Sequence, residues 1–264
     1  MNKKYELTAE TIIYSGRTLY RIRALQDFGH VKAGELGGYV QSEENLNHDG
    51  RCWVFDNAKV FDNARVSDDA MVFGTVRIFG NARMFGSARG QDAIKVFGDA
   101  KVYDSATVFG DAKVYGNARV YGDACVGDNA KVFDSAAVFE NAKVAGNARV
   151  RDHAKVFGNA RVYGDARVYG RAKVYGEARV HGDANVHGQD KCTSRVTVFD
   201  GLPRDEITVT DNHVNIGCEQ RTLDEWFECY KEVVKQAGYT DDEVEFYYQA
   251  LCLISNLPGK EVEE

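Results

Sequence analysis

Side chains with the types and spacing that catalysis needs are few in this 264-residue sequence. Histidine occurs only six times, and His153, between Asp152 and Ala154, is the best candidate for a general base, because an imidazole titrates near neutral pH. His181 and His187 stand six residues apart, a spacing that does not predict a metal site. No G-x-x-x-x-G-K-[ST] loop and no C-x-x-C pair is present, so the sequence specifies neither a phosphate-binding loop nor a zinc ribbon. We expect no metal and no cofactor.

A period of six residues organises the middle of the chain. Ala recurs at every sixth position from Ala58 to Ala184 with two exceptions in 22 positions, and a Val usually stands two residues later. Because side chains alternate along a strand, Ala and Val face inward while the basic and aromatic residues between them face outward. The Gly, Asp and Asn residues that follow are typical of a turn. Each unit therefore predicts one short strand and one corner, which must stack on neighbouring units to bury a core.

One departure from the unit predicts local compensation of volume. Gly90 removes a Val from the interior, while Met84 and Ile94 on either side are larger than the usual residue at their positions. We expect these two side chains to fill the space that Gly90 leaves.

The pattern from Val54 to Val186 resembles the hexapeptide repeat of left-handed parallel β-helices, in which three successive units form one triangular coil. The resemblance implies a mainly β fold, a left-handed triangular solenoid of about seven coils. The stretch from Arg21 to Val40, followed by Gly50 to Val54, looks like the opening of uncharacterised hexapeptide-repeat proteins of bacteria and their phages.

Many left-handed β-helix proteins are acyltransferases, which would make His153 the general base for an acyl-CoA donor. Those enzymes typically form trimers and wall the donor site with a loop that leaves a coil. Here the repeat continues without insertion, so no such loop is expected.

Coils of three units would stack equal positions into three outward faces. The first face carries Arg83, Lys101, Arg119, Ala137, Lys155 and Lys173 beside Phe85, Tyr103, Tyr121, Phe139, Phe157 and Tyr175. The second face carries Lys59, Arg77, Lys95, Lys113, Lys131, Arg149 and Arg167 beside Phe61, Phe79, Phe97, Tyr115, Phe133, Arg151 and Tyr169. One interpretation is structural, because stacked rings bury each other and the stems of Lys and Arg cover them.

The other interpretation of these rows is functional. Like charges one strand apart repel each other, and an anionic polymer or an acidic protein surface would relieve the repulsion, while exposed rings can stack with bases or sugars. The candidate ligand-binding residues are Lys95, Phe97, Lys113, Tyr115, Lys131 and Phe133.

The third face interrupts both kinds of row at its centre. Small residues stand there where the other faces have rings and cations, namely Thr107, Cys125, Gly127 and Ala145. A second surface could approach closely at such a place, so these four residues predict a contact with a protein partner or with another copy of the chain. Drift of the repeat without any function explains them equally well.

The composition divides the chain into four parts. Residues 1–53 predict short strands that form an N-terminal cap, since the end of a stacked repeat must be covered. Residues 54–188 form the repeat, and residues 189–204 form a linker. Residues 205–264 predict a small acidic α+β domain.

This C-terminal domain should contain a β-hairpin over 207–217 and two helices. Capping boxes open the helices at Thr222 and Thr240, and the helices end near Gln236 and Asn256. The expected helical core consists of Trp226, Phe227, Tyr230, Val233 and Val234 facing Val244, Tyr247, Tyr248, Leu251 and Ile254.

The net charge of −7 is distributed unevenly, with a balance of 0 in residues 1–53, +3 in 54–187 and −10 in 188–264. No apolar run is long enough to span a membrane and the N-terminus is polar, so we expect a cytoplasmic protein with no membrane contact. For a phage-encoded protein this would be the host cytoplasm.

These features favour a non-enzymatic binding or interaction scaffold, for instance a phage-encoded protein that binds or sequesters a host factor or an anionic ligand. Two alternatives stay open, an acyltransferase-like enzyme that uses acyl-CoA and a self-assembling structural protein. The expected partner is a protein or further copies of the chain, in a dimer or trimer, with an anionic polymer as the other kind of ligand.

Overall fold

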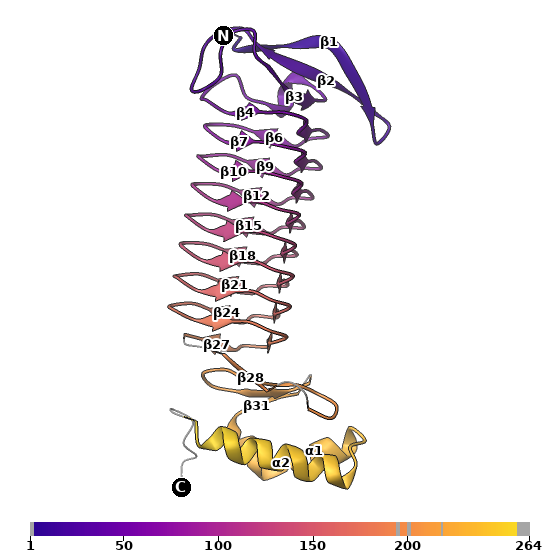
Figure 1. Ribbon diagram of the computed structural model, residues 1–264, viewed down its shortest axis with the longest axis vertical. Coiled ribbons are helices and arrows are strands. Elements are labelled where there is room, and N and C mark those ends of the chain that lie inside the picture. Colours follow the sequence, from indigo (N-terminus) through magenta and orange to yellow (C-terminus); the bar gives the residue numbers. More distant parts are fainter. Residues whose placement is uncertain (1–2, 194–195, 200–201, 218, 258–264) are drawn as a thin grey trace.

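The chain forms a rod with a cap at each end (Figure 1). The computed structural model describes residues 3–193, 196–199, 202–217 and 219–257. Two-residue strands joined by tight corners wind into stacked coils, and the strands of neighbouring coils pair in parallel. Along the rod each residue pairs with its equivalent three units later, as Lys95 does with Lys113 and Val96 with Val114. The architecture is therefore a parallel β-solenoid, and this prediction is confirmed.

Three parallel sheets run along the rod, one for each predicted face. The first face contains β6 (Arg65–Val66), β9 (Arg83–Met84), β12 (Lys101–Val102), β15 (Arg119–Val120), β18 (Ala137–Val138), β21 (Lys155–Val156), β24 (Lys173–Val174) and β27 (Lys191–Cys192). The second contains β5 (Lys59–Val60), β8 (Arg77–Ile78), β11 (Lys95–Val96), β14 (Lys113–Val114), β17 (Lys131–Val132), β20 (Arg149–Val150), β23 (Arg167–Val168) and β26 (Asn185–Val186). The third contains β4 (Trp53–Val54), β7 (Met71–Val72), β10 (Arg89–Gly90), β13 (Thr107–Val108), β16 (Cys125–Val126), β19 (Lys143–Val144), β22 (Arg161–Val162) and β25 (Arg179–Val180).

The rod has about nine coils, so the expected number of about seven is too small. The cap adds a coil at the N-terminal end, because β3 (Leu36–Val40) pairs in parallel with β5 and Leu46 bridges in parallel to Val66. The paired residues of this coil, such as Tyr39 and Lys59, are farther apart along the chain than those of the rod. The strand β27 extends the rod at the other end.

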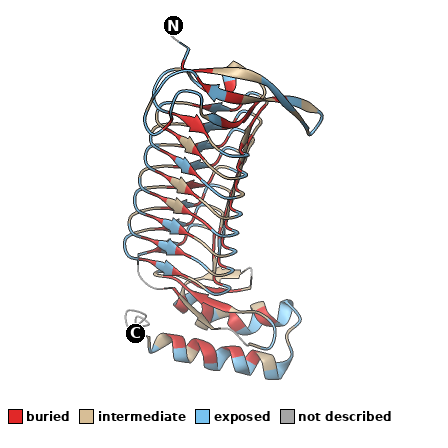
Figure 2. Cartoon of the chain, turned by 45° about the horizontal axis from the view of Figure 1, so that its top comes forward, coloured by how far each residue is buried: buried red, intermediate tan, exposed pale blue. Residues whose placement is uncertain are grey.

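The interior of the rod is a column of Ala and Val side chains, and Figure 2 colours the inward positions as buried. These inward residues are fully buried, as the alternation predicts. At Gly90, an added Cβ would lie 2.9 Å from Ile94 Cδ1 and 3.3 Å from Met84 Cε. The two larger side chains thus occupy the space of the missing Val, which confirms the expected compensation of volume.

The corners explain why Asp and Gly share one position of the repeat. This residue has a positive φ, for example 57° at Asp104 and 69° at Gly122. The Asp104 carboxylate accepts a hydrogen bond from the backbone N–H of Gly122 in the next coil at 3.2 Å. A Cβ at Gly122 would lie 2.8 Å from the backbone nitrogen of Glu140. Carboxylates at these corners therefore link successive coils, and Gly fits where the next backbone is close.

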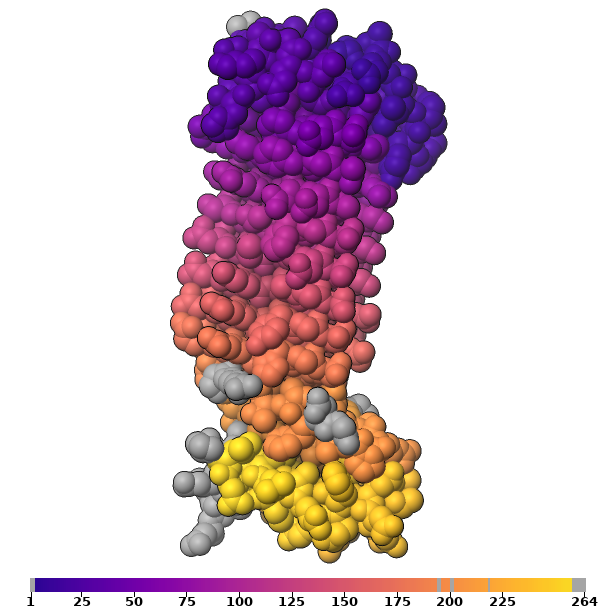
Figure 3. Space-filling model, in the orientation of Figure 1, coloured from indigo at the N-terminus to yellow at the C-terminus, as the bar shows by residue number. Residues whose placement is uncertain are grey.

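The N-terminal cap is a three-stranded antiparallel arrangement that continues the sheet of the second face. A hairpin of β1 (Tyr5–Tyr14) and β2 (Arg17–Ala24) pairs with β3, and a short 3-10 helix, η1 (Glu43–Asn45), follows. The hairpin stands out from the side of the rod in Figure 3. Its Tyr14 ring packs edge-on against Phe61 at 5.7 Å, so the cap also covers the start of the second face.

The C-terminal domain contains the expected helices and more strands than expected. An antiparallel sheet is formed by β28 (Thr197–Phe199), β29 (Ile207–Val209), β30 (Val214–Ile216) and β31 (Glu219–Arg221). The predicted hairpin is its central pair, and the predicted linker 189–204 contains β27 and β28. The helices are α1 (Leu223–Gln236) and α2 (Asp241–Ser255), each opened by the predicted capping box. In the expected helical core, Phe227 and Val233 are partly buried, and Tyr248 is exposed.

A buried carboxylate joins this domain to the last coil of the rod. Asp190 is fully buried and lies 2.7 Å from His213 Nδ1. It also accepts hydrogen bonds from Thr210 Oγ1 at 3.1 Å and Asn215 Nδ2 at 2.9 Å. His187 packs beside this group, and burial lowers its pKa, an effect that Asp190 opposes and His213 reinforces.

A charge in the buried core should prevent cooperative folding. We expect Val114→Asp to abolish the unfolding transition in urea followed by circular dichroism, because Val114 is fully buried and a carboxylate there would be unpaired. Asn117→Asp is the matched control, since it adds the same charge at an exposed corner. A normal transition for Val114→Asp would show that Val114 does not face the core.

Acid should loosen the C-terminal cap. The unfolded chain protonates His187 near its ordinary pKa of about 6.5, whereas the folded chain does so only at lower pH. The contribution of His187 to the free energy of unfolding is therefore fully present above its ordinary pKa. It is lost as the pH falls through the lowered pKa of the folded chain. We expect the melting temperature of the wild type to fall between pH 7 and pH 5 by more than that of His187→Phe. Equal losses for both proteins would exclude His187 as the cause.

Candidate functional site

The aromatic rows of the second face are stacked columns. Phe97 and Tyr115 have ring centroids 4.8 Å apart with planes 2° from parallel, and Tyr115 and Phe133 are 4.9 Å apart. Each ring therefore covers its neighbours, and all three residues are half-buried. This geometry supports the structural interpretation of the rings, which offer a ligand only their edges.

Three lysines at the centre of the second face lie beside the rings and not above them. In the part of the chain that the structure describes, Lys95, Lys113 and Lys131 have neither an ion pair nor a cation-π contact. Cation-π contacts occur instead toward the two ends of this face. Lys59 and Arg77 lie 5.4 Å and 5.9 Å from the centroid of the Tyr14 ring of the hairpin, and Arg151 lies 4.6 Å from that of Tyr169. Cations thus cover fewer rings of the second face than the sequence suggested, and Lys95, Lys113 and Lys131 stay available to an anion.

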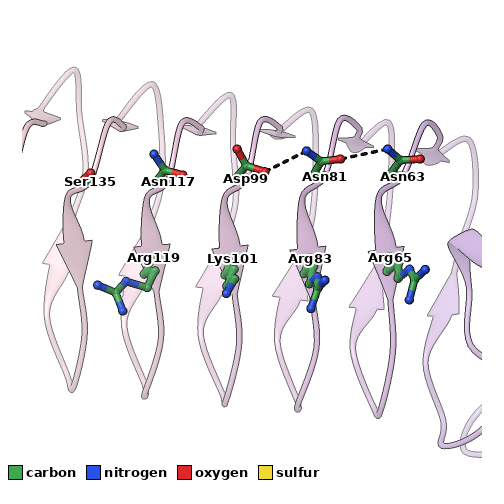
Figure 4. Close-up of a pocket in the computed structure, with 9 residues that line it drawn as sticks. All are labelled: Asn63, Arg65, Asn81, Arg83, Asp99, Lys101, Asn117, Arg119 and Ser135. Atoms are coloured by element: carbon green, nitrogen blue, oxygen red, sulfur yellow. Dashed lines mark hydrogen bonds between the residues drawn. The ribbon is translucent and has the colours of Figure 1, made fainter.

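A groove lies on the first face, where the sequence did not place the candidate ligand residues. It is hollowed along one corner of the rod, has a volume of about 620 Å³ and spans five coils (Figure 4). Its cationic wall is formed by Arg65, Arg83, Lys101 and Arg119, and its corner wall by Asn63, Asn81, Asp99, Asn117 and Ser135. In Figure 4, Arg65 turns toward the cap and Arg119 turns the opposite way, so the cations spread along the groove.

The four cations of the groove are exposed and have no ion pair within the described residues. The one carboxylate of the corner wall, Asp99, accepts a hydrogen bond from Asn81 Nδ2 at 2.9 Å. Asn81 in turn accepts from Asn63 Nδ2 at 3.1 Å. The groove is therefore a positively charged channel edged by amide groups, which can donate hydrogen bonds to phosphate or sulfate.

The corner next to this groove has Gly in three successive coils. Gly80, Gly98 and Gly116 follow each other there at φ values of 70°, 70° and 69°, whereas carboxylates alternate with Gly in the same coils of the other corners, as in Asp104 and Gly122. A second run of three Gly, at Gly146, Gly164 and Gly182, lies farther along the rod. The N–H groups of Gly98 and Gly116 accordingly have no carboxylate from the preceding coil, and no acceptor for them appears in the described chain. Fewer carboxylates thus stand at the corner where the cations are aligned.

The third face is less open than its small residues predict. Thr107 and Cys125 pair in register and are half-buried. Gly127 is buried, because a Cβ there would lie 2.0 Å from Phe109 Cζ, so the Phe109 ring occupies the space above it. Gly127 therefore accommodates a ring of its own chain. Ala145 lines a hollow of about 270 Å³ with Tyr163, which leaves that part of the face as the place for a contact.

His153 is exposed and stands one coil beyond Ser135 in the same corner column. None of the hydrogen bonds or ion pairs in the described part of the chain involves its ring. The described residues also contain no group of three or more His, Cys, Asp or Glu arranged to hold a metal ion. The geometry gives His153 no partner that would orient or activate it as a base.

Arg65 and the corner amides were missed by the sequence analysis. The signal was present in the corner column that precedes the first face, which reads Asn63, Asn81, Asp99, Asn117 and Ser135 with a single carboxylate. Counting acids in each corner column separately would have singled out this face.

A comparison with family models supports the class of this fold. A model described as the YdcK beta solenoid repeat matches residues 112–128 and 154–170, two stretches of the rod. The chain is a repeat β-solenoid protein. The match concerns the repeat alone and leaves the acyltransferase resemblance unconfirmed. A comparison with curated proteins found no match. Within the residues that the structure describes, no helix of this β-solenoid has the length and apolarity that crossing a membrane requires.

The ring columns should contribute to stability. We expect Tyr115→Ala to lower the free energy of unfolding by roughly 1 to 3 kcal/mol, because two stacked contacts of about 0.5 to 1.5 kcal/mol each are lost. Tyr163→Ala is the matched control, since Tyr163 is 40% exposed and its stacking partner His181 lies 5.4 Å away. Urea unfolding measures both variants. An equal and small effect at the two positions would contradict a stabilising role for the columns.

Proposed function

We propose that this β-solenoid is a non-enzymatic binding scaffold that holds an extended anionic polymer in the groove of the first face. The observation that supports this most is the row formed by Arg65, Arg83, Lys101 and Arg119, which are exposed, in register and without carboxylate partners in the described chain. Cations one strand spacing apart, about 4.8 Å, raise each other's energy. A polymer of phosphates or sulfates relieves this repulsion and releases its own counterions on binding.

The charge distribution along the molecule agrees with this site. The groove occupies coils near the N-terminal cap, whereas residues 188–264 carry a net charge of −10 at the other end of the rod. That acidic domain repels a polyanion and restricts it to the part of the rod nearer the cap.

The remaining features of the proposal rest on the sequence. We retain the left-handed winding, the cytoplasmic location and the phage context with a host factor as partner as proposals from the resemblance of the repeat and of the N-terminal stretch. A dimer or trimer would use the third face near Ala145. The acyltransferase alternative with His153 as base draws no support from the surroundings of that side chain.

Charge reversal in the groove tests the proposal. We expect Arg83→Glu/Lys101→Glu/Arg119→Glu to abolish retention of the full chain on immobilised single-stranded DNA and on heparin in a salt gradient, with little change in melting temperature. The matched control is Lys95→Glu/Lys113→Glu/Lys131→Glu, which makes the same charge change on the second face. Loss of retention in the control alone would move the site to the second face, and wild type that flows through at low salt would refute the proposal.

A further inference from the structure

The aromatic column of the first face ends one coil before the coil that the cap forms. From Phe85 onward the rings stack without a break, with Phe85 and Tyr103 at 4.9 Å and 1° from parallel. In the preceding coil the same position is Ser67. In the cap coil it is Asn47, whose backbone N–H donates to Val66 O as that of Phe85 donates to Val102 O. Within the residues that the structure describes, Phe85 therefore stacks with Tyr103 on one side and has no ring contact on the other.

The missing ring leaves a hollow of about 580 Å³. Phe85 and Ser67 line it, Asn47 lies on the cap side, and Arg65 and Arg83 belong to it as they belong to the groove. Glu43 and Glu44 of η1 line it as well. Glu43 is paired with Lys3 at 2.6 Å, whereas Glu44 is exposed. The hollow thus combines the Phe85 ring, two guanidinium groups, the imidazole of His48 and two carboxylates, of which that of Glu44 has no ion pair within the described residues.

We infer that this hollow is a subsite for a nucleotide, with the base stacked on Phe85 in the place of the absent aromatic side chain. The aromatic column shows that successive coils hold planar rings about 4.9 Å apart, as they hold Phe85 and Tyr103. A phosphate near Arg65 and Arg83 would be held by charge-assisted hydrogen bonds. The Glu44 carboxylate can accept a hydrogen bond from an exocyclic amino group or ring N–H of the base.

This inference rests on the proposed function, because it names the ligand chemistry at the cap end of the same groove. A purely anionic polymer such as heparin would use the cations alone. A nucleotide uses the cations, the ring face and the carboxylate together, and base stacking on an aromatic side chain tolerates different bases. The nucleotide can be free or can be the phosphorylated end of a single strand.

Isothermal titration calorimetry of the full chain with adenosine monophosphate tests the subsite. We expect Ser67→Tyr to weaken binding at least tenfold, since the Tyr ring would fill the place on Phe85 that the base would otherwise occupy. Tyr stands at this position in other coils, for instance Tyr103 and Tyr121, so the variant should melt no lower than the wild type. Ser67→Ala is the matched control, which leaves the hollow open and should bind as the wild type does. Arg65→Gln is a second variant, which removes a charge and leaves the place above the Phe85 ring open, and it should also weaken binding.

The choice of ligands separates ring recognition from charge. Ribose 5-phosphate and adenosine should each bind at least tenfold more weakly than adenosine monophosphate. Undetectable binding of the monophosphate, equal binding by Ser67→Tyr and wild type, or ribose 5-phosphate that binds as tightly as the monophosphate would overturn the inference. A 5′-phosphorylated oligonucleotide that binds more tightly than the monophosphate would identify a strand end as the source, and equal affinity would identify the free nucleotide.

The two proposals can fail separately. Ser67→Tyr retains every cation of the groove, so its retention on heparin should equal that of the wild type. If heparin is retained while adenosine monophosphate does not bind, the groove stands and the subsite is wrong. If the monophosphate binds while heparin flows through, the polymer groove is wrong.

Discussion

The constant register between coils is the constraint on which the rest of this β-solenoid depends. Each outward residue donates its backbone N–H to a carbonyl in the next coil, as Lys95 donates to Ala112 and Phe97 to Val114. These bonds place every side chain directly over its counterpart in the neighbouring coil. An insertion in one coil would displace all the following columns on that side. The narrow Ala and Val core, the stacked rings and the rows of cations are all consequences of this one register.

The same register determines where charge accumulates. Many of the acids of the rod are engaged at corners, where carboxylates such as Asp104 bind the backbone of the next coil. They are consequently not free to neutralise the basic rows, and the mild net charge of +3 over residues 54–187 conceals an ordered positive surface. Where three Gly residues replace those carboxylates, at Gly80, Gly98 and Gly116, the corner wall of the groove retains Asp99 as its one carboxylate.

The sequence could predict whatever follows from a strict period. The strands, the three faces, the buried Ala and Val, the compensation around Gly90 and the capping boxes of both helices all agree with the structure. The number of coils was wrong because the cap coil pairs at a wider spacing along the chain and contains Gly37 and Gly38 instead of the repeat unit. A Cβ at Gly37 would lie 2.6 Å from Val54 O, so this strand packs too closely for the usual residues.

The groove could not be predicted in the same way. Its shape depends on the direction in which each Arg and Lys side chain turns and on the hydrogen bonds between corner amides such as Asn63 and Asn81. The second face has a similar composition, but its Lys95, Lys113 and Lys131 are half-buried beside stacked rings. The small residues of the third face suggested an open surface, and Phe109 covers one of them, Gly127.

The central claim, that four aligned cations of one groove bind an anionic polymer, is tested most directly by the salt dependence of binding. The logarithm of the association constant for a single-stranded oligonucleotide should fall with the logarithm of salt concentration with a slope of about −3, since each of the four contacts contributes about 0.7 to the slope for single strands. Arg119→Gln should reduce the magnitude of the slope by about 0.7, while Lys113→Gln on the second face should leave it unchanged. A slope near zero, or a slope that responds to Lys113→Gln and not to Arg119→Gln, would contradict the account.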